Sequence, residues 1–173
     1  MLKPVKSKTF RAGAARFAIV ASRYNATYVD AMLRAARSEL KRAGASEIKV
    51  VRVPGAFEIP VVASFLARAS SPRFHLRQGE AVSFSAIICL GVVLRGQTVH
   101  AAHIAEAVSR ALMEIQLRDG VPVIHEVLLL ENEEQARARC LGRKHNRGAE
   151  AAQTALAMAE LMERLGGGPD ACF

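Results

Sequence analysis

An apolar run that gives way to a polar loop and then to a helical pattern constrains the fold of this chain most. Residues 86–94 read AIICLGVVL, which has the length and the β-branched content of a buried strand. The next four residues, RGQT, are polar. Apolar residues then recur at helical spacing, at Ile104, Val108, Ala111 and Ile115. The sequence therefore predicts a strand, a short polar loop and a helix with His100 in its first turn.

The same succession of strand, polar loop and helix occurs along the whole chain. Short apolar strands are expected at 17–21, 48–53, 86–94 and 121–130. Each is followed by a helical pattern. Thr27 is a candidate cap for the first helix, Gly44 its expected end, and Pro60 places the start of the second. Alternating strands and helices predict a parallel sheet with helices on both faces.

The chain length and the absence of a linker segment in the sequence predict a single domain. The 173 residues suffice for one core, and no linker divides them. We expect an N-terminal arm at 1–16, one domain at 17–165 and a flexible tail at 166–173. Residues 69–84 mix proline, glycine and charge and are expected to form a long connection without an assigned role.

Charge and cysteine content restrict the class of protein. The net charge is +8, but the basic residues are spread along the chain without a nucleic-acid-binding motif, so we expect no nucleic-acid partner. Three cysteines fit neither a disulfide framework nor a metal site, and Cys89 is expected in the core. No apolar run is long enough to cross a membrane, and the basic N-terminus lacks the apolar region of a signal peptide. We therefore expect a cytoplasmic protein.

Three loops with unusual side chains follow strands of the expected sheet: Tyr24-Asn25, residues 56–58, and residues 95–100. The carboxyl ends of parallel strands share one edge, where ligands bind, so these loops are expected to converge. His100 can transfer protons near neutral pH, and a helix N-terminus suits an anion. Structural roles are open as well: Tyr24 could be a half-exposed side chain rather than a stacking platform, and Glu58 could only complement a helix dipole.

Four segments together resemble 6,7-dimethyl-8-ribityllumazine synthase of riboflavin biosynthesis: SRYN, VPGAFEIP, LGVVLRGQTVH and ENEEQARARC, with a later NRG. The resemblance covers residues 17–163. It implies a three-layer flavodoxin-like sandwich with a central, mainly parallel four-stranded sheet. It also implies the condensation of 5-amino-6-(D-ribitylamino)uracil with 3,4-dihydroxy-2-butanone 4-phosphate, which gives 6,7-dimethyl-8-ribityllumazine, phosphate and water without a metal or organic cofactor.

The resemblance also assigns roles to particular residues. His100 matches the proton-transfer residue, and His125 matches an aromatic residue that closes the pocket from a neighbouring subunit. The residues matched to the binding of ribitylaminouracil are Tyr24, Ala56, Phe57, Glu58, Val93 and Leu94. The residues matched to phosphate binding are Gly96, Gln97, Thr98 and Arg139.

The resemblance also implies an assembly of several copies, and the sequence departs from the family pattern at a few positions. Family members form pentamers with active sites between subunits, some pentamers assemble into a 60-subunit shell, and riboflavin synthase is a possible partner. Here Ala101 and Ala102 replace an aromatic and an acidic residue, so an orienting acid for His100 would have to come from Glu106 or Glu126. These departures, with His125, keep a second hypothesis open: a flavin- or lumazine-binding paralogue or a shell-forming protein with weak or no turnover.

Overall fold

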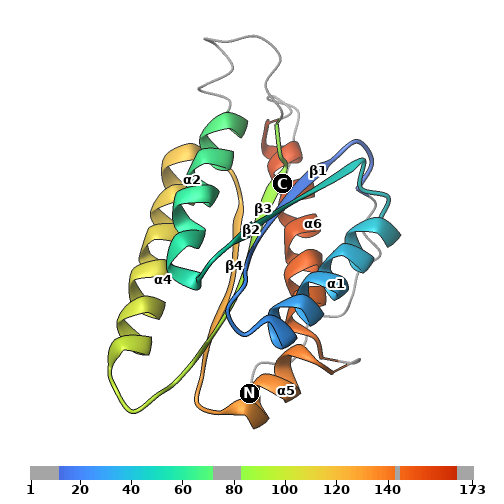
Figure 1. Cartoon of the computed structure of the whole chain (residues 1–173). Coiled ribbons are helices and arrows are strands. Elements are labelled where there is room, and N and C mark those ends of the chain that lie inside the picture. Colours follow the sequence, from blue (N-terminus) through green and yellow to red (C-terminus); the bar gives the residue numbers. More distant parts are fainter. Residues whose placement is uncertain (1–11, 72–82, 143–144, 167–173) are drawn as a thin grey trace.

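The computed structural model describes residues 12–71, 83–142 and 145–166. Its strands form one sheet in the order β2-β1-β3-β4, and every neighbouring pair is parallel (Figure 1). The strands are β1 (Arg16–Ser22), β2 (Glu47–Val53), β3 (Ala86–Leu94) and β4 (Val123–Leu130).

Helices cover both faces of this sheet (Figure 1). One face carries α2 (Ile59–Ser70) and α4 (His100–Asp119), and the other carries α1 (Ala26–Arg42), α5 (Glu133–Cys140) and α6 (Arg147–Gly166). A short 3-10 turn, η1 (Ala56–Glu58), precedes α2. The three-layer flavodoxin-like sandwich is therefore confirmed, and the described strands are all parallel.

Alternation along β1 explains why the sheet is buried on both sides. Phe17, Ile19 and Ala21 belong to the core beneath α1 and α6, whereas Ala18 and Val20 belong to the core beneath α2 and α4. All five side chains are fully buried. A parallel sheet whose crossovers lie on both faces needs such continuously apolar strands. The apolar run at the centre of the sequence, β3, is buried in the same way from Ala86 to Val92.

The helix boundaries confirm two of the expected signals and correct a third. Gly44 follows α1 with φ +82°, a left-handed conformation that glycine adopts without strain, and Pro60 lies in the first turn of α2. Thr27 does not cap α1, because the helix already begins at Ala26 and the capping position belongs to Asn25. The Asn25 carbonyl accepts hydrogen bonds from the amides of Tyr28 and Val29.

A close helix–helix approach fixes α6 against α1. A Cβ added to Gly148 would lie 2.0 Å from the carbonyl oxygen of Met32, which is backbone and cannot move away. The first turn of α6 therefore requires glycine, and α1 and α6 pack as one layer over β1 and β3.

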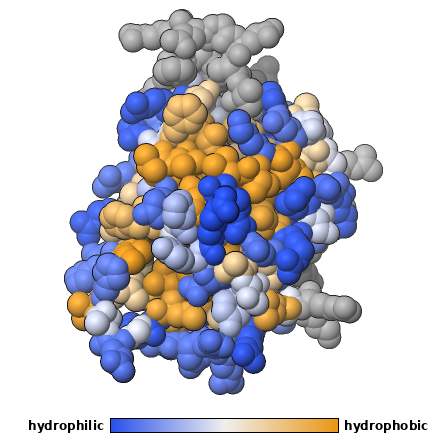
Figure 2. All heavy atoms as spheres, in the orientation of Figure 1, coloured by the Kyte–Doolittle hydropathy of each residue, from blue (hydrophilic) through white to orange (hydrophobic). Residues whose placement is uncertain are grey.

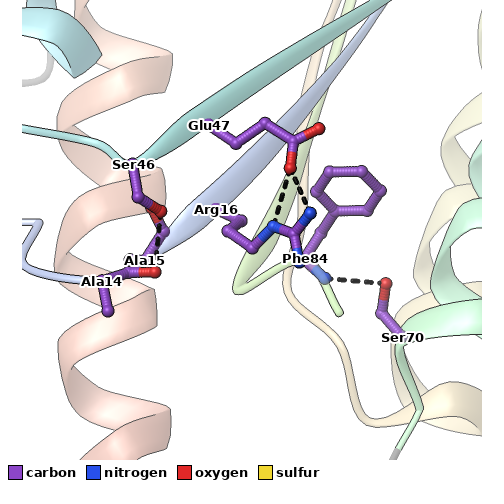
Figure 3. Close-up of polar contacts among 7 residues, drawn as sticks. All are labelled: Ala14, Ala15, Arg16, Ser46, Glu47, Ser70 and Phe84. Carbon is purple, nitrogen blue, oxygen red and sulfur yellow. Dashed lines mark hydrogen bonds and ion pairs between the residues drawn. The ribbon is translucent and has the colours of Figure 1, made fainter. Parts of the chain in front are cut away.

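Polar contacts fix the amino-terminal edge of the sheet (Figure 3). Arg16 and Glu47, which face each other in the β1–β2 register, form an ion pair with Arg16 Nε 2.7 Å from the carboxylate. Ser70 at the end of α2 accepts a hydrogen bond of 3.0 Å from the amide of Phe84, which leads into β3. These contacts lie at the end of the sheet opposite the strand carboxyl termini.

Several expectations concern segments outside the described residues. Residues 1–11 of the expected arm, residues 167–173 of the expected tail and residues 72–82 of the long connection are not described. The helix α2 extends through Ser70, so the first two residues of the expected connection are helical. Cys89 is a buried free thiol in β3, as expected. None of the helices in the described segments is long and apolar enough to cross a membrane.

Candidate active site

A cavity of about 1200 Å³ lies at the carboxyl edge of the sheet, where β1, β2 and β3 end. Seven residues expected from the sequence contribute to its wall: Tyr24, Ala56, Phe57, Glu58, Val93, Leu94 and His100. The cavity lies where β1 and β3 are adjacent while the helices that follow them, α1 and α4, cover opposite faces of the sheet. This topological switch point is the usual ligand position in open parallel sheets.

Tyr24 and Glu58 meet over Gly55. A Cβ added to Gly55 would lie 2.8 Å from Glu58 Oε2 and 3.1 Å from Tyr24 Cδ2. The Tyr24 amide also donates to the carbonyl of Pro54 at 3.1 Å, which joins the loop after β1 to the loop after β2. Tyr24 is 71% exposed, so it stands at the rim of the cavity rather than in the core. Glycine at position 55 is what allows both side chains to occupy these positions.

Glu58 has a structural contact within the chain. Its Oε2 accepts a hydrogen bond of 2.8 Å from the Gly55 amide, so the carboxylate caps the short turn η1. One carboxylate oxygen of Glu58 therefore has the structural role at a helix terminus that the sequence analysis left open. A carboxylate can accept several hydrogen bonds, so acceptor capacity toward the cavity remains.

His100 is the first residue of α4 and is exposed at the cavity wall. The two acids considered as its orienting partner have other contacts. Glu106 pairs with Arg110 at 2.8 Å, and Glu126 faces Arg147 at 3.7 Å. Within the described segments, no hydrogen bond joins His100 to a carboxylate.

Glu126 occupies an unusual environment on β4. Burial raises its pKa to about 7, against the opposing attraction of Arg147 and Arg139, while the nearby Glu150 raises it further. Arg147 is shared, because its Nη1 lies 2.7 Å from the Glu150 carboxylate. Glu126 therefore links β4 to α6 and is a poor hydrogen-bond acceptor for α4, which lies across the sheet.

The loop from Gly96 to Thr98 is exposed and lies between the end of β3 and the start of α4. Unlike Val93 and Leu94, these three residues do not contribute to the cavity wall. Arg95, just before them, lies 3.2 Å from Glu131, which ties this loop to the end of β4. A Cβ at Gly96 would meet no atom within 4 Å, so internal packing does not require glycine there.

Arg139 and His125 lie away from the cavity of their own chain. Arg139 is exposed on α5, on the other face of the sheet. The His125 Nε2 lies 2.8 Å from Ser109 Oγ. Since the Ser109 hydroxyl donates its proton to the Ala105 carbonyl at 2.7 Å, the imidazole is the donor to Ser109. His125 is exposed and supported by α4.

The cavity wall also has residues to which the sequence analysis gave no part in substrate binding. Asn25 lies beside Tyr24, and α4 contributes a long stripe to the wall: His103, Ile104, Glu106, Ala107, Arg110, Ala111 and Glu114. Spacings of three and four residues from His100 onward place much of this stripe on one helical face, so the periodicity carried a signal for it. These residues were not assigned because the cavity wall continues along α4 beyond the RGQTVH segment.

Fold and cavity together define a parallel α/β protein with a cavity at the carboxyl ends of its strands. The family model for 6,7-dimethyl-8-ribityllumazine synthase matches residues 14–163, and the chain belongs to this family of riboflavin-biosynthesis transferases. It is 44% identical over 153 residues to the 6,7-dimethyl-8-ribityllumazine synthase of Xanthomonas oryzae pv. oryzae (strain PXO99A), covering 87% of this chain and 92% of that protein. The same named enzyme of Stenotrophomonas maltophilia (strain R551-3) is 44% identical, covering 87% of this chain and 91% of that protein.

Proposed function

We propose that the protein condenses 5-amino-6-(D-ribitylamino)uracil with 3,4-dihydroxy-2-butanone 4-phosphate to give 6,7-dimethyl-8-ribityllumazine, phosphate and water. The observation that carries the proposal is the shared cavity wall of Tyr24, Glu58 and His100, brought together from three strand ends. An exposed ring, a carboxylate and an imidazole supply what a flat polyhydroxylated amine needs: stacking, hydroxyl acceptors and proton transfer. No metal or organic cofactor is proposed.

The pyrimidine ring is proposed to stack on Tyr24, with its polar edge on the backbone of Val93 and Leu94. Both residues line the cavity at the end of β3. The ribityl chain would lie along residues 56–58, where the Glu58 oxygen not bonded to Gly55 can accept hydroxyl hydrogen bonds.

The phosphorylated substrate is proposed to lie beside the N-terminus of α4. Amides of Gly96, Gln97 and Thr98 precede this helix, and the open space around Gly96 leaves room for an anion. The Arg139 guanidinium would pair with the phosphate and stabilise it as it leaves.

His100 is proposed to transfer the protons that the condensation requires. The substrate amine attacks the ketone, and water leaves as the imine forms. Elimination of phosphate then gives an enol that tautomerises to a new carbonyl, and the second amine closes the ring on this carbonyl with loss of a second water. Each step adds or removes a proton close to neutral pH, which suits an imidazole at the cavity wall. Orientation of two substrates in one cavity supplies the rest of the acceleration.

Association of several copies is proposed to complete the site, in a pentamer or a 60-subunit shell of such pentamers. His125 and Arg139 lie away from their own cavity, so a neighbouring copy would supply them. An apolar area surrounded by hydrophilic residues crosses the face that shows the edge strand β2 (Figure 2). Large apolar side chains are also exposed on η1, α2 and α4: Phe57, Val61, Phe65, Met113 and Leu117. Such exposure is typical of surfaces buried by association. Riboflavin synthase is proposed as a further partner, and the buried thiols of Cys89 and Cys140 fit a cytoplasmic location.

The experiment is to mix the purified protein with both substrates and follow lumazine by its absorbance and fluorescence. We expect formation far above the uncatalysed rate, and His100→Ala should lower kcat by about a hundredfold or more with little change in KM. Flavin or lumazine binding without turnover would instead support the paralogue hypothesis. An unchanged kcat in His100→Ala would remove this residue from proton transfer.

A further inference from the structure

The residue next to Tyr24 has an unusual backbone conformation. Asn25 has φ 55° and ψ 42°, and it is the one non-glycine residue with a positive φ among the described segments. Asparagine tolerates this left-handed region better than most residues other than glycine. The turn at Asn25 ends β1, starts α1 and determines the direction in which the preceding Tyr24 leaves the sheet.

The Asn25 side chain joins this turn to the neighbouring strand. Its Nδ2 donates a hydrogen bond of 2.8 Å to the carbonyl of Val92. The pairing of β1 with β3 ends at Ala21 and Leu90, so this bond holds the two strands together beyond their ladder. Val92 immediately precedes Val93 and Leu94 on the cavity wall.

Tyr24 therefore lies between two attachments. On one side its amide donates a hydrogen bond to the Pro54 carbonyl, and its ring lies 3.1 Å from the place where a Cβ on Gly55 would stand. On the other side Asn25 bonds the end of β3. The ring itself is exposed, and no side-chain hydrogen bond to the Tyr24 hydroxyl is present among the described contacts. These two attachments, one through the Tyr24 amide and one through the Asn25 side chain, are what determine the distance between the ring and the β3 edge.

We propose that Asn25 is a positioning residue that fixes the Tyr24 ring opposite the Val93–Leu94 edge and thereby sets the affinity of the cavity for a flat heterocycle. The inference deepens the proposed function and rests on it for the identity of the heterocycle. It adds a role for a residue that makes no proposed contact with substrate.

The test uses two substitutions of Asn25, each of which removes the hydrogen bond to Val92 in a different way. Asn25→Gly keeps the left-handed backbone accessible and removes the amide, whereas Asn25→Asp keeps the shape but presents a carboxylate that cannot donate to Val92. Both should raise the KM for ribitylaminouracil about tenfold, the value of one hydrogen bond, with kcat and the KM for butanone phosphate within about twofold. Ser70→Ala is the matched control, because it removes a side-chain bond to Phe84 at the opposite edge of the sheet (Figure 3).

Action through Tyr24 is tested by a double-mutant cycle. In a Tyr24→Ala background, Asn25→Gly should have no further effect on the KM. Full additivity of the two changes would overturn the proposal, as would a rise in KM for Ser70→Ala equal to that for Asn25→Gly.

A measurement without ligand separates this inference from the proposed function. The chain has two tyrosines and no tryptophan, so Tyr28→Phe leaves Tyr24 as the only tyrosine fluorophore. In that background, Asn25→Gly should lower the residual anisotropy of Tyr24, because the ring gains local motion. An unchanged anisotropy decay overturns the positioning role whether or not the protein makes lumazine. Absence of lumazine formation by the wild type contradicts the proposed function alone.

Discussion

Gly55→Ala is a small perturbation that acts directly on the cavity. Gly55 has φ −128°, an extended conformation that alanine adopts without strain. The added methyl group would lie 2.8 Å from Glu58 Oε2 and 3.1 Å from Tyr24 Cδ2. Ordinary contacts begin near 3.4 Å, so the carboxylate must retreat by about 0.6 Å and the ring by about 0.3 Å. Both atoms belong to side chains that can move, so the fold should survive.

The energetic effect follows from the bond that is lost. Retreat of Glu58 breaks or lengthens its hydrogen bond of 2.8 Å from the Gly55 amide. A partly exposed charge-assisted bond of this kind contributes about 1 kcal/mol, which corresponds to a fall in Tm of about 3 °C for a chain of this size. The displaced ring and carboxylate should each weaken substrate binding, and together we expect the KM for ribitylaminouracil to rise by about tenfold or more.

The assay is steady-state lumazine formation with each substrate varied in turn, combined with thermal unfolding. Gly166→Ala is the control, because a Cβ there meets no atom within 4 Å. It should leave both KM values unchanged. If Gly55→Ala leaves the KM for ribitylaminouracil unchanged, or raises only the KM for butanone phosphate, then Tyr24 and Glu58 do not hold the ring substrate.

Three further predictions concern stability, pH and phosphate. Gly148→Ala should lower Tm by more than about 10 °C, because its Cβ would lie 2.0 Å from the Met32 carbonyl; a fall below about 2 °C in thermal unfolding would contradict this packing. Burial raises the pKa of Glu126 to about 7, so the native state retains a proton that the unfolded chain has lost. The unfolding free energy should therefore fall from about pH 4.5 to 7, and Glu126→Gln should flatten that fall in urea titrations; an equal slope in both proteins would refute it. Arg139→Ala should raise the KM for butanone phosphate about tenfold or more and leave the other KM unchanged, and equal effects on both would argue against a phosphate role.

Local patterns were sufficient to predict the layers of the fold. The apolar strands, the helical periodicity after His100 and the turn signals at Gly44 and Pro60 each depend on neighbours in sequence, and the structure has elements at all of them. Convergence of the loops at Tyr24 and Glu58 also followed, because parallel strands share one carboxyl edge.

Contacts between distant segments could not be predicted in this way. Gly148 meets Met32 across more than a hundred residues, and the sequence around either residue does not indicate the encounter. Asn25 was placed in a candidate loop, but its contact was not predicted, because its side-chain amide bonds Val92, 67 residues away, whereas local rules favoured Thr27 as the helix cap. The roles proposed for Arg139 and His125 require a neighbouring copy, and the sequence of one chain does not determine how copies associate.

The most direct test of the proposed reaction is to measure lumazine and inorganic phosphate together in one reaction of the purified protein with both substrates. We predict one phosphate released for each lumazine formed, with both products dependent on both substrates and strongly reduced in His100→Ala. Phosphate release without lumazine, or neither product from a protein that binds lumazine tightly, would contradict the proposed synthase activity.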